Sequence, residues 1–95
     1  MRIHQEYSPA IPIHPGEILQ EELDARGWTQ KGFAEQIGRP PQLINNIVNG
    51  RAGISAETAL DFSDAFGTSA QFWMNLDSNY RLAMARKKRT ERKAS

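Results

Sequence analysis

The sequence contains no cysteine, and this absence excludes a disulfide framework and a cysteine-based zinc site. No apolar run approaches the roughly 18 residues that a membrane-spanning helix needs, and the first residues lack the apolar core of a signal peptide. With 95 residues, of which 39% are apolar, we expect one small cytoplasmic domain that does not bind a membrane.

The chain also lacks an overall excess of one charge, since its formal net charge is only +1. Residues 81–95 hold seven basic side chains and one acidic side chain, a net charge of +6, whereas residues 1–80 hold five basic and ten acidic side chains, a net charge of −5. Attraction to nucleic-acid phosphates depends on clustered positive charge. The total charge therefore gives no argument for DNA binding, which would need local cations or the basic tail.

Catalytic constellations are missing as well. There is no Gly-rich phosphate loop and no visible Ser/His/Asp arrangement. The carboxylates of residues 17–24 have no nucleophile or metal ligand beside them, which favours a solvated helix face. His4 and His14 are ten residues apart without a third ligand, which favours surface side chains over a metal site. We expect no enzyme, no cofactor and no metal.

What the sequence does contain is a stretch, residues 29–50, with the pattern of two short helices joined by a tight turn. Thr29 suits a helix N-cap, and Gly38 suits the left-handed residue that ends a helix. Pro40 and Pro41 are tolerated in the first turn of a second helix, whose apolar positions are Leu43, Ile44, Ile47 and Val48. Two such helices form a helix-turn-helix, which places its second helix in the DNA major groove. A helical hairpin used only for packing is the alternative.

Further helical patterns flank this stretch and predict an all-α, compact five-helix domain. The helices are expected over residues 15–26, 30–37, 41–48, 56–66 and 70–87. The predicted core consists of Leu23, Phe33, Ala34, Ile37, Ile44, Ile47, Leu60 and Phe66.

The two ends of the chain differ from the rest in composition. Residues 1–13 include Pro9 and Pro12 and are expected to form a flexible, extended N-terminal arm. The DNA-binding domain should span residues 14–87. Residues 88–95 lack apolar periodicity and are expected to form a basic mobile tail.

Five residues in the central stretch resemble the helix-turn-helix of the Cro and phage-repressor family. The glutamine, alanine, glycine and two aliphatic residues that recur in that family match Gln30, Ala34, Gly38, Ile44 and Ile47. The small alanine lets two helices approach, the glycine makes the turn, and the aliphatic residues anchor the second helix.

Longer motifs resemble a narrower family, the HigA antitoxins, also called virulence-associated protein I-like proteins. These motifs are HPGEIL (residues 14–19), INNIVNG (44–50), ISAETAL (54–60) and GTSAQFWMNLDSNY (67–80), and the likeness covers about residues 14–84. The resemblance implies a homodimeric repressor that binds the operator of its own operon. It also implies the antitoxin of a type II toxin-antitoxin system, with a HigB-type ribonuclease toxin as partner.

One departure from the repressor pattern affects the site. Many such repressors begin the second helix with polar base-contacting residues, whereas this chain has Arg39-Pro40-Pro41. Amide side chains can still pair with adenine N6 and N7. We therefore expect base contacts from Gln42, Asn45, Asn46 and Asn49. Phosphate contacts are expected from Gln30, Lys31, Arg39 and Arg51.

A single short helix makes too few base contacts to select one genomic site, so two copies should act together. The wide apolar face of residues 70–87 is a candidate for the dimer interface. The residues expected there are Trp73, Leu76, Tyr80 and Met84, with Trp73, Tyr80 and Met84 facing the partner. Two alternatives remain open, namely a protein-interaction module with little DNA binding and a stand-alone phage-type repressor without a toxin.

Overall fold

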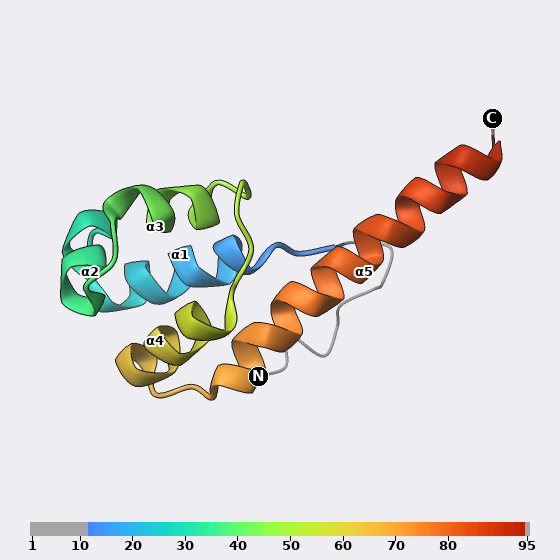
Figure 1. Ribbon diagram of the computed structural model, residues 1–95. Helices are drawn as coiled ribbons and strands as arrows, with labels where there is room; N and C mark the ends of the chain where they lie inside the picture. Colours follow the sequence, from blue (N-terminus) through green and yellow to red (C-terminus); the bar gives the residue numbers. More distant parts are fainter. Residues whose placement is uncertain (1–11, 95) are drawn as a thin grey trace.

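The structure is a computed structural model that describes residues 12–94, and five α-helices contain most of them (Figure 1). They are α1 (Pro15–Arg26), α2 (Gln30–Ile37), α3 (Pro41–Val48), α4 (Ala56–Phe66) and α5 (Ala70–Ala94). These bounds confirm the predicted ends of the first four helices and the predicted start of the fifth. No strand occurs within residues 12–94, so this part of the chain is all-α.

Local sequence explains where the helices begin. The hydroxyl oxygen of Thr29 accepts a hydrogen bond from the Gly32 N–H at 2.9 Å, and that of Ser55 accepts one from the Thr58 N–H at 3.1 Å. Such N-caps satisfy backbone donors that have no partner within the helix. Gly38 ends α2 with φ of 70°, a left-handed conformation that glycine adopts without a steric penalty.

The first four helices and the beginning of α5 enclose one core, whereas the second half of α5 extends away from the body (Figure 1). Phe33, Phe62, Phe66 and Trp73 meet in the core, with ring centroids of neighbouring pairs 5.0–5.9 Å apart. Stacked and edge-on aromatic pairs add to the stabilisation from burial. The other buried apolar residues are Ile18, Leu19, Leu23, Ala34, Ile44, Ile47, Ile54, Ala59 and Leu76.

Leu60 is a correction to the predicted core, because 59% of it is exposed. The buried face of α4 consists of Thr58, Ala59, Phe62 and Phe66. At about 100° per residue, Leu60 falls on the opposite side of the helix from Phe62. Ile37, also predicted as core, is half-buried and packs at the edge of the core.

The C-terminal end of α5 differs from the prediction, since the helix continues through Ala94 instead of ending near residue 87. Lysine and arginine have high helix propensity, so a basic segment without an apolar face can prolong a helix that is already formed. Of the predicted N-terminal arm, only residues 12 and 13 are among the described residues. Ile13 is half-buried and packs on the core.

Gly16 brings the start of α1 against the end of α3. A Cβ atom on Gly16 would lie 1.9 Å from the carbonyl oxygen of Ile47 and 3.0 Å from the Cα atom of Val48. Only a residue without a side chain allows the two backbones to approach so closely. Gly16 therefore sets the position of α3 on the body.

Candidate nucleic-acid interface

The outward face of α3 consists of amide side chains. Ile44 and Ile47 are fully buried and fix which side of the helix faces the core. Gln42 and Asn49 are exposed, and Asn45 and Asn46 are half-buried. Gln42 donates a hydrogen bond from Nε2 to Asn46 Oδ1 at 3.0 Å, one helical turn away. The structure thus brings together the four residues predicted to contact bases.

Gln30 lies between α1 and α3 instead of projecting freely. Its Nε2 donates to Gln20 Oε1 at 3.3 Å, and its Oε1 accepts from Asn45 Nδ2 at 3.2 Å. This amide bridge orients Asn45 on the outward face. Gln30 was predicted as a phosphate contact, and the structure adds this positioning role.

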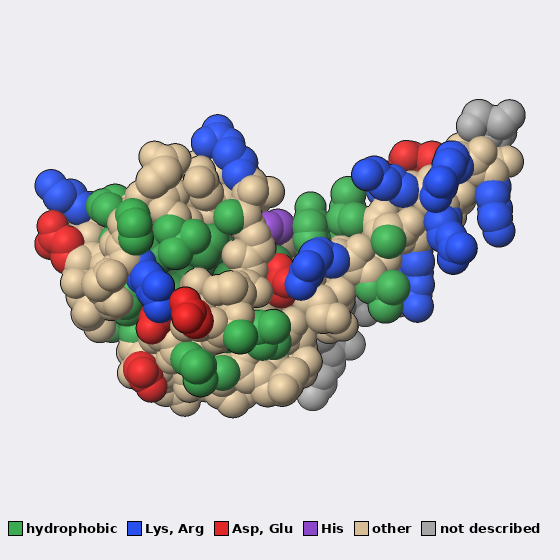
Figure 2. Space-filling view, viewed as in Figure 1, with side chains coloured by type: hydrophobic (Ala, Val, Ile, Leu, Met, Phe, Trp, Pro, Cys, Tyr) green, Lys and Arg blue, Asp and Glu red, His purple; other side chains and the backbone are tan. Residues whose placement is uncertain are grey.

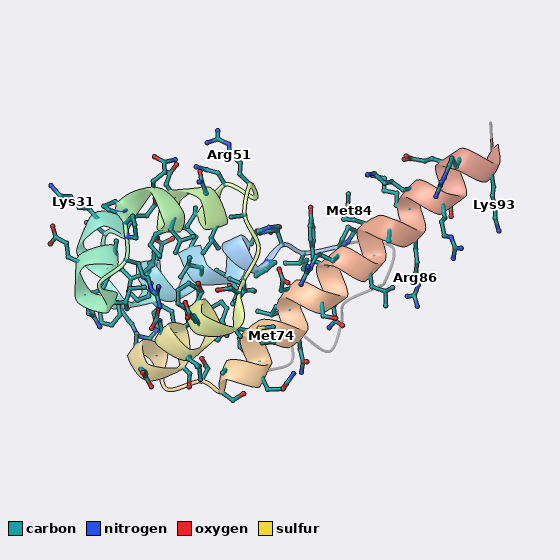
Figure 3. The ribbon with its side chains drawn as sticks, in the orientation of Figure 1. Lys31, Arg51, Met74, Met84, Arg86 and Lys93 are labelled. Carbon is teal, nitrogen blue, oxygen red and sulfur yellow. The ribbon has the colours of Figure 1, made fainter. Side chains whose placement is uncertain are left out.

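Lys31 and Arg51 are exposed cations near opposite ends of the helix-turn-helix (Figure 3). Arg51 follows α3 in a loop that is fixed by hydrogen bonds from the Arg51 and Ala52 N–H groups to the Asn46 carbonyl oxygen, at 2.8 and 3.1 Å. Exposed cations suit contacts with DNA phosphates, and the amide face beside them suits contacts with base edges.

The guanidinium group of Arg39 is directed to α4. Its Nε donates to Asp61 Oδ2 at 2.7 Å, and its Nη1 lies 3.7 Å from Glu57 Oε1. The hydrogen bond to Asp61, together with the charge of that carboxylate, raises the pKa of Arg39 above its ordinary value. Arg39 is therefore engaged by two carboxylates in the free protein, and its phosphate contact stays a prediction.

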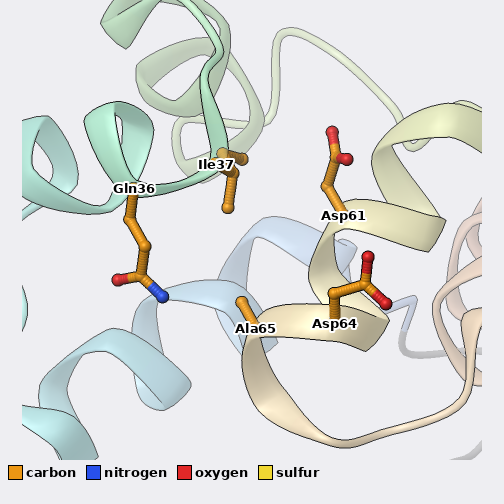
Figure 4. A pocket seen from close by; sticks show the side chains of 5 residues that line it. All are labelled: Gln36, Ile37, Asp61, Asp64 and Ala65. Carbon is orange, nitrogen blue, oxygen red and sulfur yellow. The ribbon is translucent and has the colours of Figure 1, made fainter.

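A pocket of about 300 Å³ lies beside this ion pair, between α2 and α4 (Figure 4). Its lining residues are Gln36, Ile37, Asp61, Asp64 and Ala65. They provide carboxylates but neither a nucleophile nor an imidazole. Within residues 12–94, no three His, Cys, Asp or Glu side chains are grouped so that they could hold a metal ion. None of the helices described is both long and apolar enough to cross a membrane.

Trp73 is a correction to the predicted dimer interface, because it is fully buried in the core of one protomer. Its indole Nε1 donates to Thr68 Oγ1 at 2.8 Å, which satisfies the polar atom of the ring. Leu76 is also buried, with 6% of it exposed. Tyr80 and Met84 are half-buried, and Met84 lies where α5 leaves the body (Figure 3). Only these last two of the four predicted interface residues offer substantial surface to a partner subunit.

His14 has a structural role that sequence reasoning missed. Its Nδ1 accepts a hydrogen bond from the Gly16 N–H at 2.9 Å and so caps α1. Its ring contacts that of Tyr80 edge-on, with the two ring centroids 4.7 Å apart. Burial lowers the pKa of His14 from its ordinary value, while Asp77 and Glu17 oppose this shift. The position before Pro15 at a helix start was the available signal, since proline favours the first helical position.

Asp77 was also missed and fixes the loop between α3 and α4. This buried carboxylate accepts a hydrogen bond from the Ile54 N–H at 3.0 Å, and its Oδ2 lies 2.6 Å from Arg81 Nη2 in an ion pair. A Cβ atom on Gly53 would lie 2.4 Å from Asp77 Oδ1. An acidic residue within the apolar face of the last helix was the signal that could have revealed it.

Comparisons with known proteins agree with this geometry. The family model described as Helix-turn-helix matches residues 19–73. Virulence-associated protein I of Dichelobacter nodosus is 45% identical over 74 residues, which are 77% of this chain and 68% of the relative.

Solved structures of similar fold include an addiction module antidote protein of the HigA family from Coxiella burnetii. Its TM-score is 0.80 and its sequence identity is 40%, and the match covers 85% of this chain and 89% of that chain. The antitoxin HigA of Pseudomonas aeruginosa, solved with the higBA promoter, has a TM-score of 0.82 and 41% identity, and the match covers 86% of this chain and 90% of that chain. The chain therefore belongs to the helix-turn-helix family, in its HigA antitoxin branch.

Proposed function

We propose that this protein is a DNA-binding repressor that acts as the antitoxin of a HigBA-like type II toxin-antitoxin system in the cytoplasm. It represses its own operon and neutralises a ribonuclease toxin. The observation that carries this proposal is the row of four outward amides on α3 and its C-cap residue Asn49, in a chain similar to an antitoxin solved with promoter DNA. An α-helix of this kind fits the major groove of B-form DNA.

Sequence is read in this proposal by Gln42, Asn45, Asn46 and Asn49. An asparagine or glutamine amide can donate to adenine N7 and accept from adenine N6 at the same time, which favours A·T pairs at the contacted positions. Gln42 and Asn46 hydrogen-bond each other in the free protein, so each has a defined orientation before DNA binds. Lys31 and Arg51 contact phosphates and set the orientation of α3 on the duplex.

The repressor acts as a two-fold dimer, because two α3 helices must reach half-sites about one helical turn, ~34 Å, apart. Tyr80 and Met84 form the subunit contact, since they lie on the face of α5 that continues beyond the core. The partner subunit covers the half-buried surface that a single protomer leaves on this face.

A test combines DNA binding and toxin neutralisation. Binding of the full chain to the promoter of its own gene should exceed binding to a scrambled duplex of equal length by at least about 1,000-fold. Co-expression with the product of the neighbouring gene should restore growth if that gene encodes the toxin. Operator binding without neutralisation would indicate a stand-alone repressor.

The engaged Arg39 favours a second candidate, a module that neutralises a protein partner with little DNA binding. Its ion pairs with Asp61 and Glu57 leave few free cations near α3, in a body whose residues 1–80 carry a net charge of −5. Neutralisation without preference for the promoter would support this candidate and exclude the repressor.

A further inference from the structure

The last two turns of α5 carry the largest group of positive side chains in the described part of the chain. We call residues 86–93 the basic end. They comprise six basic residues and Glu91, a net charge of +5, and all of them are exposed. Within residues 12–94, no ion pair joins Arg86, Lys87, Lys88, Arg89 or Lys93 to an acidic side chain.

The body offers far fewer cations for phosphate binding. Arg26 is paired with Glu22, Arg39 with Asp61, and Arg81 with Asp77. Outside the basic end, Lys31 and Arg51 are the described basic residues without an ion pair. Two cations per protomer provide little counterion release, which supplies much of the affinity of proteins for DNA.

The fold places the basic end away from the acidic side chains of the body. The 25 residues of α5 span about 37 Å, and Figure 2 shows the basic end as a separate group of positive charge beyond the body. In Figure 3, α5 continues from Met84 to Lys93 beyond the body, with Arg86 and Lys93 projecting from the far half of the helix. Arg86, Arg89 and Lys93 form one row along the helix, while Lys88 and Arg92 form another.

We propose that the basic end of α5 binds the phosphate backbone of the DNA beside the half-site that α3 reads. The inference rests on the proposed function and assigns a role to residues outside the family match, which ends at residue 73. The basic end supplies the electrostatic attraction that the uncharged face of α3 lacks. Phosphates recur along every duplex, so this contact adds affinity without adding sequence preference.

The test compares the full chain with a variant that carries Arg86→Gln, Lys87→Gln, Lys88→Gln and Arg89→Gln. Glutamine has a helix propensity similar to that of lysine and arginine, so α5 should remain helical. Operator affinity is measured between 50 and 200 mM salt. For each phosphate contact removed, the slope of log affinity against log salt should become shallower by about 0.9. Between 50 and 200 mM salt, the affinity of the unmodified chain should then fall by about 3.5-fold more than that of the variant for each contact removed. The ratio of operator to scrambled-duplex affinity should stay the same.

A matched control exchanges charge for equal charge, with Arg86→Lys, Lys87→Arg, Lys88→Arg and Arg89→Lys. This variant should keep the slope of the unmodified chain. An unchanged slope in the glutamine variant overturns the proposal, even if toxin neutralisation is lost, because the basic end would then serve a protein partner. Loss of the dimer in the glutamine variant, seen by light scattering, would place the basic end in the subunit interface and overturn it as well.

The scrambled duplex separates this proposal from the proposed function. If the unmodified chain shows no preference for its promoter, the repressor hypothesis fails. The difference in salt slope between the chain and the glutamine variant on scrambled DNA still decides whether the basic end binds phosphates.

Discussion

Helix α3 and the basic end of α5 are opposites in chemistry and in packing. The eight residues of α3 contain no charged side chain, whereas the eight residues of the basic end carry a net charge of +5. One face of α3 is held in the core by Ile44 and Ile47, while every side chain of the basic end is exposed. Under the two proposals above, α3 reads the DNA sequence and the basic end attracts the phosphates, so separate parts of this chain perform the two tasks.

Different forces give the two regions their helical form. A helix of eight residues is marginal by itself, so α3 depends on burial and on the close approach of Gly16. The basic end extends a helix whose first half is already fixed by Trp73 and Leu76, and each added residue then needs only favourable propensity. Variants that remove the packing of α3 against the core should therefore abolish this helix. The basic end should stay helical as long as the body remains folded.

The largest effect is expected from Ile47→Asp, which would bury an unpaired charge beneath α3. The free energy of unfolding should fall by roughly 3–5 kcal/mol or more, a large part of the stability of a small domain. Thermal unfolding followed by circular dichroism would show loss of the cooperative transition. Leu60→Asp is the control, because Leu60 is exposed, and it should change the stability by less than about 0.5 kcal/mol. A cooperative transition of the Ile47→Asp variant at the temperature of the unmodified chain would contradict the assigned core.

The next largest effect should come from Tyr80→Glu combined with Met84→Glu, at the junction between the body and the basic end. Like charges from two subunits would meet, so a folded monomer is expected. Operator affinity should fall by about 100-fold or more, because the second half-site no longer binds as part of one particle. Light scattering and DNA binding should be measured on the same samples.

Leu82→Glu serves as the control for that double variant, since Leu82 is 50% exposed and lies across the helix from Met84. It should remain dimeric. If the double variant is also dimeric, the subunit contact lies elsewhere on the chain.

The sequence predicted the body well because its signals are local. Thr29, Pro40, Pro41 and Ser55 act on their own neighbours in the chain and mark the starts of α2, α3 and α4, and Gly38 marks the end of α2. The end of α5 could not be predicted in this way, because periodicity reports a buried face and the basic end has none.

Long-range contacts explain what the local pattern could not reveal about the site. Arg39 lies 22 residues from Asp61 in the chain, and nothing in the local pattern distinguishes this ion pair from a free cation. Trp73 was expected to face the partner subunit, but Phe62 and Phe66 contact it in the core of the protomer. The amide face of α3 was found because its spacing is set within one helix.

A smaller effect is expected from Asn45→Ala combined with Asn46→Ala, which would remove the centre of the amide face. Each paired contact to a base contributes ~1–3 kcal/mol of discrimination, so the preference for the operator over single-base variants should decline at the contacted positions. The salt slope should remain that of the unmodified chain, because no charge is altered. Fluorescence anisotropy with a set of substituted duplexes would measure both quantities.

Gln71 and Asn75 provide the matched control for the amide pair. They form the same hydrogen bond one helical turn apart, at 2.8 Å, on the exposed side of α5. Gln71→Ala combined with Asn75→Ala should change neither affinity nor preference. Unaltered operator preference in the Asn45 and Asn46 variant would exclude α3 as the reading helix.

The smallest effect concerns His14, which lies between the two regions because it caps α1 next to Gly16 and contacts Tyr80 on α5. Its Nδ1 can accept the Gly16 hydrogen bond only when the imidazole is neutral, and burial lowers its pKa below the ordinary value of 6.5. As the pH falls, the imidazole therefore takes up a proton in the unfolded chain before it does so in the folded chain. The contribution of the neutral imidazole to stability is present above pH 6.5 and declines as the pH falls from 6.5 to the folded-state pKa. The variant His14→Asn keeps an N-cap but does not titrate. Its free energy of unfolding, measured in urea between pH 7.5 and 5.5, should lack this part of the pH dependence, which amounts to about 1 kcal/mol or less. Equal pH dependence in the two chains would show that the imidazole is not held neutral, and α1 would then be capped in a way that does not depend on His14.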